Sequence, residues 1–143
     1  MQGVPTWVQS VVKESNGHGI QFIMTKKITK SDWNPQQNRL LIPKQYVNEI
    51  QLMLSHEEKT LANLNPTVTV NGGGLDIRVF TRNNFRVEEL KLQRWDSTGS
   101  SVINGRGMNV FRAWSYLNVA DIVGMWGFRD GRDGKLCFAI GKV

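Results

Sequence analysis

Residues able to hold a polyanion concentrate in one stretch of the sequence, residues 26–39. Its cations and amide or aromatic side chains are Lys26, Lys27, Lys30, Arg39, Trp33, Asn34, Gln36, Gln37 and Asn38. Lysine and arginine neutralise phosphates, whereas Asn, Gln and Arg can form paired hydrogen bonds with base edges. Only Asp32 opposes this positive charge. The composition favours a nucleic-acid contact, although solvated loops between strands are also rich in Lys, Asn and Gln, and Pro35 suits an ordinary turn.

A second stretch of the same kind lies at residues 91–100. Lys91, Arg94 and Trp95 precede a polar turn that contains Ser97 and Thr98. Because side chains alternate along a strand, Lys91 and Trp95 are expected on the face away from the apolar residues that flank them. A further strand follows the turn, so the pattern predicts a projecting hairpin.

The elements that must position these two stretches are mostly short strands. Apolar strands are expected at residues 20–28 and 40–42, and the period changes to two from residue 67 onward. A helical stripe over residues 7–12 and a capping box at Ser55–Glu58 predict short helices. About seven strands without strand–helix alternation predict a mainly β fold, a seven-stranded open antiparallel barrel. Residues 1–19 are expected to pack on this barrel as a helical tail, and residues 20–143 to form one domain.

Composition narrows the class of protein. The chain has 143 residues and a formal charge of +6, which favours an anionic partner. The single cysteine, Cys137, excludes a disulfide framework, and no apolar run approaches the ~20 residues that span a bilayer. Neither His18 nor His56 lies in a recognisable catalytic or metal-binding motif. The expectation is a protein with no enzymatic activity, no cofactor, no metal site and no membrane association.

Several motifs resemble one known family. Thr29–Asp32 followed by Asn38–Lys44, with Gly107–Phe111 and Leu117–Asp121 further on, is similar to the plant B3 DNA-binding domain. The resemblance covers roughly residues 20 to 140. It implies a DNA-binding pseudobarrel in a nuclear plant transcriptional regulator, with two loops, here called the first arm (residues 26–39) and the second arm (residues 91–100), entering the major groove. Oligomeric state and protein partners stay open.

The resemblance and the residue chemistry together give an expected contact set. Phosphate contacts are expected from Lys26, Lys30, Arg39, Lys91 and Arg94. Contacts inside the groove are expected from Trp33, Asn34, Gln37, Asn38, Trp95, Ser97 and Thr98. The arms must then lie side by side, with Arg39 and Arg94 on the same side of the molecule.

Three positions depart from the family pattern. Met108 stands where tryptophan is usual, Ala120 where glycine is usual, and Asp96 where a neutral amide is common. A carboxylate near phosphates is repelled, unless it accepts a hydrogen bond from a cytosine amino group. Asp96 and Met108 motivate an alternative function, a protein-interaction module of the same fold that has lost DNA binding, with Trp33 and Trp95 as interface anchors. Core positions are expected at Val110, Phe111, Trp114, Tyr116 and Leu117.

Overall fold

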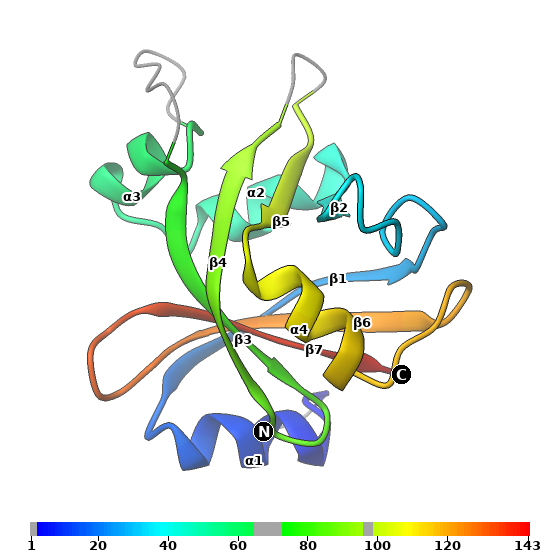
Figure 1. Ribbon diagram of the computed structural model, residues 1–143. Coiled ribbons are helices and arrows are strands. Elements are labelled where there is room, and N and C mark those ends of the chain that lie inside the picture. The colour runs from blue at the N-terminus through cyan, green and yellow to red at the C-terminus, as the bar shows by residue number, and fades with distance from the viewer. Residues whose placement is uncertain (1–2, 65–72, 96–98) are drawn as a thin grey trace.

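Figure 1 shows the computed structural model, which describes residues 3–64, 73–95 and 99–143. The helices are α1 (Thr6–Glu14), the 3₁₀ helix η1 (Lys44–Tyr46), α2 (Val47–Gln51), α3 (His56–Leu61) and α4 (Gly107–Trp114). The strands are β1 (His18–Lys27), β2 (Arg39–Ile42), β3 (Leu75–Thr81), β4 (Arg86–Arg94), β5 (Ser101–Asn104), β6 (Ile122–Arg129) and β7 (Leu136–Lys142). The strand expected at residues 67–70 lies outside the described residues.

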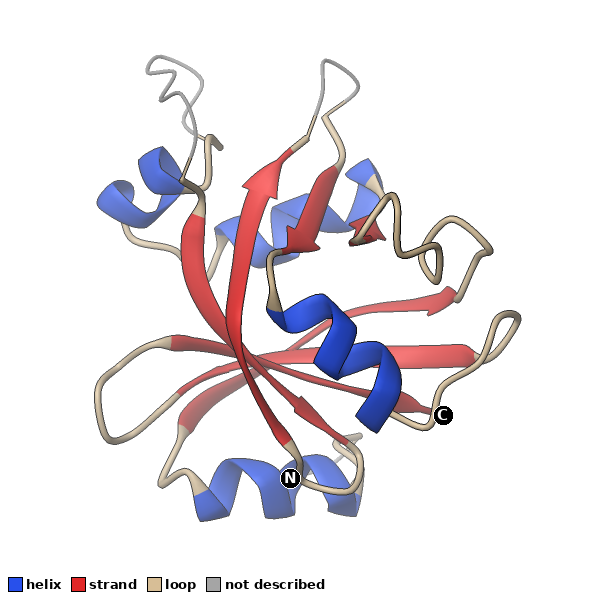
Figure 2. Ribbon diagram, in the orientation of Figure 1, coloured by secondary structure: helices blue, strands red, loops and turns tan. Residues whose placement is uncertain are grey.

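The described strands form one strongly curved sheet in the order β1-β6-β7-β3-β4-β5-β2 (Figure 2). This confirms the predicted seven-stranded open barrel. One detail differs, because β3 and β7 pair in parallel while the other pairings are antiparallel. β1 and β2 are the two ends of the sheet order, so the barrel stays open between them.

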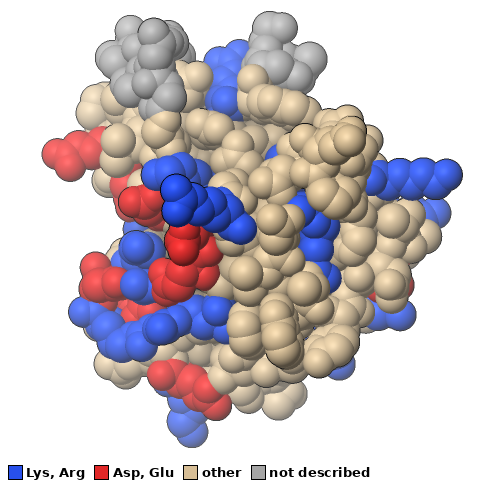
Figure 3. All heavy atoms as spheres, in the orientation of Figure 1, with Lys and Arg blue, Asp and Glu red and all other residues tan. Residues whose placement is uncertain are grey.

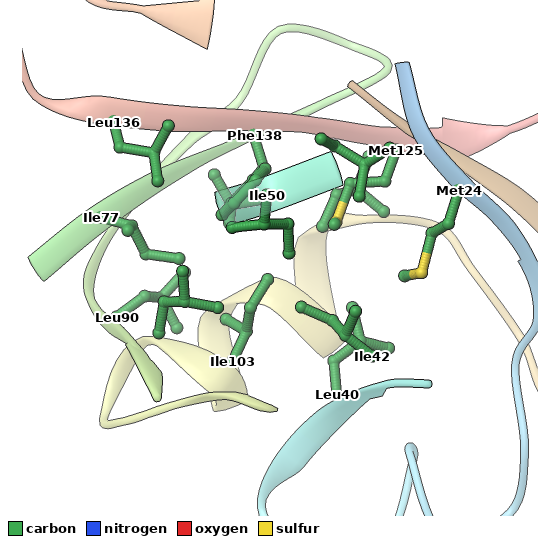
Figure 4. Packing of buried hydrophobic residues seen from close by; sticks show 14 of the residues in the cluster. Met24, Leu40, Ile42, Ile50, Ile77, Leu90, Ile103, Met125, Leu136 and Phe138 are labelled. Carbon is green, nitrogen blue, oxygen red and sulfur yellow. The ribbon is translucent and has the colours of Figure 1, made fainter. Parts of the chain in front are cut away.

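Apolar side chains fill the space inside the curved sheet. Figure 4 shows Leu40, Ile42, Leu90 and Ile103 on one side of this core, directed towards Phe138 and its neighbours on the other. A smaller cluster lies under α1, where Trp7 meets Trp126 edge to face with ring centroids 5.8 Å apart. Burial of this kind contributes about 25 cal/mol per Å² of apolar surface and is the main force that holds the arms' supporting strands in place.

The helices follow local sequence signals closely, with one correction. The predicted capping box exists: the backbone N–H of Glu58 donates to the Ser55 side chain, and the N–H of Ser55 donates to the Glu58 carboxylate. The prediction that Val110, Trp114 and Tyr116 belong to the core is wrong, because they are 39%, 50% and 71% exposed. α4 buries the stripe of Met108 and Phe111 and turns its other side outward.

In the described part of the chain, no helix combines the length and apolarity needed to cross a lipid bilayer.

Candidate nucleic-acid interface

The two arms connect to neighbouring strands of the sheet. β5 pairs with β2, which follows the first arm, and also with β4, which leads into the second arm. The guanidinium carbon of Arg39 lies 4.8 Å from the centroid of the Trp95 ring, within the range of a cation–π contact. Arg39 therefore touches the residue next to Arg94, which confirms that the two arms lie side by side.

A buried carboxylate organises the first arm. Asp32 is fully buried, and each of its oxygens accepts from two donors. Oδ1 accepts from Arg39 Nη1 at 3.0 Å and from the backbone N–H of Leu41 at 3.1 Å. Oδ2 accepts from the N–H of Thr29 at 2.9 Å and lies 2.8 Å from Lys26 Nζ. The carboxylate thereby ties the first arm to the ends of β1 and β2.

Lys26 also closes the open side of the barrel. Its ammonium group donates to the backbone carbonyl of Leu41 at 2.8 Å, so a side chain from β1 reaches β2 where no strand pairing joins them. The pKa of Lys26 is lowered, because burial disfavours its charge more than Asp32 favours it. Burial raises the pKa of Asp32, but the bonds from Lys26, Thr29 and Leu41 outweigh it, and the net pKa is lowered. Asp32 is therefore ionised at neutral pH.

Phosphate contacts from Lys26 and Arg39, as expected from the sequence, require exposed side chains, and the structure buries both. Their side chains are only 8% and 9% exposed, because Asp32 compensates their charge inside the fold. The sequence contained a signal for this arrangement, since Asp32 is the only acidic residue in the first arm. Lys30, by contrast, is exposed and makes no ion pair with a described residue.

The amides of the first arm divide into structural and exposed groups. Asn38 has a left-handed backbone (φ 51°), donates to the Gly105 carbonyl and accepts from Arg112 Nη2 at 2.8 Å. Asn34 accepts the N–H of Gln36 and shapes the turn. The side chain of Gln37 is exposed at the tip. Gln37 is therefore better placed than Asn38 to reach a ligand.

Trp33 anchors the first arm to the body of the protein. Its ring meets Phe111 of α4 at an interplanar angle of 74°, with centroids 5.8 Å apart. Its indole N–H donates to the Leu117 carbonyl at 3.1 Å. Because the ring edge and the N–H are both used within the fold, Trp33 fixes where the arm stands.

The second arm has a paired cation at its root and exposed groups near its tip. Lys91 forms an exposed ion pair with Asp76 at 2.7 Å. Arg94 is exposed where β4 ends, and Trp95 is 47% exposed beneath Arg39. Asp96, Ser97 and Thr98 lie outside the described residues. Sequence reasoning missed Lys44, which stands beside Gly99 of this arm, although it ends the Asn38–Lys44 motif.

Two of the unusual positions are now placed. Met108 is fully buried in the core. Ala120 has a φ of 78°, in the left-handed region that favours glycine, and its N–H donates to the Ile28 carbonyl where β1 enters the first arm. Gly107, next to Met108, is required for steric reasons. A Cβ at this position would lie 2.1 Å from the Glu88 carbonyl oxygen, so α4 can begin this close to β4 only because residue 107 is a glycine.

Charge is unevenly distributed on the face in Figure 3. Acidic side chains gather on the left, whereas the upper right, where the first arm lies in Figure 1, shows lysine and arginine without acidic neighbours. The acidic groups on β4 and the β6–β7 turn are used structurally, as Arg78 pairs with Glu88, Asp130 and Asp133. Among the described residues, no group of three or more metal-ligating side chains is gathered at one place.

The chain matches known proteins in sequence and in fold. A model of the family described as B3 domain-containing protein At2g31720-like matches residues 1–143. The chain is 25% identical to the Arabidopsis thaliana B3 domain-containing protein At2g31720 over 123 residues, covering 85% of this chain and 39% of that protein. It is 28% identical to the Arabidopsis thaliana B3 domain-containing protein At1g05920 over 145 residues, covering 95% of this chain and 44% of that protein. The chain thus spans less than half the length of these relatives.

A solved structure shares the fold. The Arabidopsis FUS3–DNA complex superposes with a TM-score of 0.51 at 16% sequence identity, covering 86% of this chain and 99% of that one.

Proposed function

Because the chain belongs to the At2g31720-like family of B3 domain-containing proteins, we propose that it binds double-stranded DNA sequence-selectively, with both arms in the major groove. In this proposal it is part of a plant transcriptional regulator that acts in the nucleus and has no catalytic role. FUS3, which shares the fold, is bound to DNA in its structure. Longer relatives leave room for further activities of a whole protein, and the proposal concerns this domain alone.

One observation carries the proposal: the Arg39 guanidinium lies 4.8 Å from the Trp95 ring and joins the arms. Because the two arms are held together on one sheet, they can both contact a duplex without losing freedom of motion relative to each other on binding. Pre-organisation of this kind reduces the entropy cost of binding. A chain whose arms stood on separate faces could not contact one groove with both.

The proposed contacts follow from exposure. Lys30, exposed on the first arm, contacts phosphate, and Arg94 does so on the second arm. Gln37 reaches base edges from the first arm and Trp95 from the second. Ser97 and Thr98, which lie outside the described residues, are proposed as groove contacts from the sequence alone. Lys26, Arg39, Trp33 and Asn38 act mainly by holding the arms in position, because their side chains are engaged within the fold. Asn34 shapes the tip, and Lys91 contributes to the positive field while paired with Asp76.

Salt dependence tests the proposal. Fluorescence anisotropy with a random duplex at several salt concentrations should give a steep log–log decrease in affinity, with Lys30→Ala reducing the slope by about 1. Lys13→Gln, which removes an exposed cation on α1, at the opposite end of the molecule from the β4–β5 hairpin (Figure 1), should leave the slope unchanged. A wild-type affinity that does not respond to salt contradicts DNA binding.

Selectivity needs a separate measurement. Selection from a random duplex pool should enrich one sequence, and Gln37→Ala should lower the preference for it over random DNA. A good bidentate base contact is worth about 1–3 kcal/mol of discrimination. If every duplex in the pool binds the wild-type protein equally, the protein binds DNA without reading its sequence.

A further inference from the structure

A depression next to the second arm has the chemistry of an anion site. It has a volume of about 260 Å³ and lies between the segment η1–α2 and the root of the second arm. Polar side chains with hydrogen-bond donors ring it: Lys44, Asn48, Gln51 and Arg94. Its floor is apolar, formed by the buried residues Val47 and Leu64. No carboxylate is among its described lining residues, so the described side chains favour an anion over a cation.

The position of Lys44 is fixed by the second arm. A Cβ at Gly99 would lie 3.2–3.3 Å from the aliphatic carbons of the Lys44 side chain, so its stem rests against the backbone of the arm. Gly99 has a φ of +89°, a conformation that favours glycine. Lys44 is exposed and forms no ion pair with any residue in the described ranges. Packing of the stem leaves the ammonium group presented to solvent beside the arm.

We propose that this depression holds a phosphate of the DNA backbone, next to the groove that the second arm enters. The inference rests on the proposed function and extends it to residues outside both arms. Lys44 and Arg94 supply the charge, and the amide N–H groups of Asn48 and Gln51 donate to phosphate oxygens. Exposed aromatic rings are absent from the described lining, so the site has nothing on which to stack a base.

The expected role is positional. Contacts from η1 and α2 come from elements that pack on the barrel core through Val47 and Ile50. A phosphate held there sets how deeply the second arm enters the groove. Such a contact contributes to affinity for every sequence and does not discriminate among bases.

The test compares two variants with the same loss of charge. Lys44→Gln removes the proposed contact, whereas Lys13→Gln removes an exposed cation on α1, at the opposite end of the molecule from the β4–β5 hairpin (Figure 1). One lost phosphate contact changes the log–log salt slope by about 0.9. The affinity deficit of Lys44→Gln relative to wild type should therefore be about 3.5-fold larger at 50 mM than at 200 mM salt. Lys13→Gln should show no such change.

A second variant probes the site without removing a cation. Asn48→Asp places a carboxylate in the depression on an exposed position and should weaken binding of random and selected duplexes by the same factor. Circular dichroism and thermal unfolding confirm that each variant is folded. If Lys44→Gln and Asn48→Asp both bind as Lys13→Gln does while wild type keeps a steep salt slope, the phosphate site is refuted and DNA binding stands. A salt-independent wild type refutes both.

Discussion

Replacing Asp32 with asparagine is expected to destabilise the protein by about 3–5 kcal/mol, the usual cost of removing one partner from a buried ion pair. The side chain keeps its shape but loses its charge. Lys26 and Arg39, only 8% and 9% exposed, then lie in the protein without a neutralising group. A loss of this size is a large part of the 5–15 kcal/mol by which domains are usually stable.

The hydrogen bonds support the same magnitude. In the native protein each oxygen of Asp32 accepts from two donors, either Arg39 and Leu41 or Lys26 and Thr29. Asparagine presents an NH₂ group in place of one oxygen, so two donors then face another donor. A buried donor without an acceptor costs about 1–3 kcal/mol. Relaxation of Lys26 towards solvent keeps the total below the sum of these penalties.

Urea unfolding monitored by tryptophan fluorescence gives the free energy of unfolding of each variant. Calorimetry should show a Tm for Asp32→Asn that is roughly 10–20 °C below that of the wild-type protein. Asp76→Asn is the matched control. It breaks an ion pair of similar length, 2.7 Å from Lys91 Nζ, but both partners are exposed. An exposed pair contributes about 0–1 kcal/mol.

A loss below about 1 kcal/mol for Asp32→Asn, equal to that of Asp76→Asn, would refute the assignment of Asp32 as the organising group of the first arm. A double-mutant cycle sharpens the test. Lys26→Met combined with Asp32→Asn should cost less than the sum of the two single changes, since the second change removes a charge that the first left unpaired. Additive effects would show that the two residues do not interact.

Two further changes test other parts of the fold. Ala120→Gly should stabilise the protein by up to about 1 kcal/mol. Removing the strain of a left-handed alanine gains about 1–2 kcal/mol, which exceeds the cost of the entropy that glycine adds to the unfolded chain. A lower Tm for this variant would contradict the prediction. Glu58 is held by two hydrogen bonds from Arg129, at 2.7 and 2.6 Å, which lower its pKa. A depressed carboxyl pKa stabilises the fold above the unfolded value of about 4.3, and this contribution is lost as the pH falls through the folded value. Glu58→Gln should therefore cost about 1–3 kcal/mol at pH 7 and progressively less below about pH 4, as measured by urea unfolding at each pH; a pH-independent cost would contradict it.

Sequence patterns were sufficient where structure depends on neighbours along the chain. The stripe at residues 7–12 became α1, and Ser55 and Glu58 formed the capping box that begins α3. Both arms were found because cations, amides and turn residues cluster between apolar strands. Their adjacency followed from the resemblance to a family and is now supported by the contact of Arg39 with Trp95.

Sequence patterns were insufficient where a side chain has a distant partner. Lysine and arginine are usually exposed, and the lone Asp32 in the first arm did not by itself show which cations it would draw into the fold. Their burial depends on Asp32 and on the meeting of β1 with β2, which are separated by the whole width of the sheet in its pairing order. Trp114 was wrongly assigned to the core because large aromatic residues are usually buried, whereas the structure exposes half of its side chain.

The amino-acid sequence by itself determined which segments become strands, helices and arms, because propensity, alternation and capping act over a few residues. The tertiary structure alone decided which cations face solvent and which lie within the fold. The physical reason is that the free energy of a charged group depends on the charges and donors within a few ångströms, and these come from residues far apart in the chain. Asp32 and Lys26, brought together where the barrel stays open, are the clearest example.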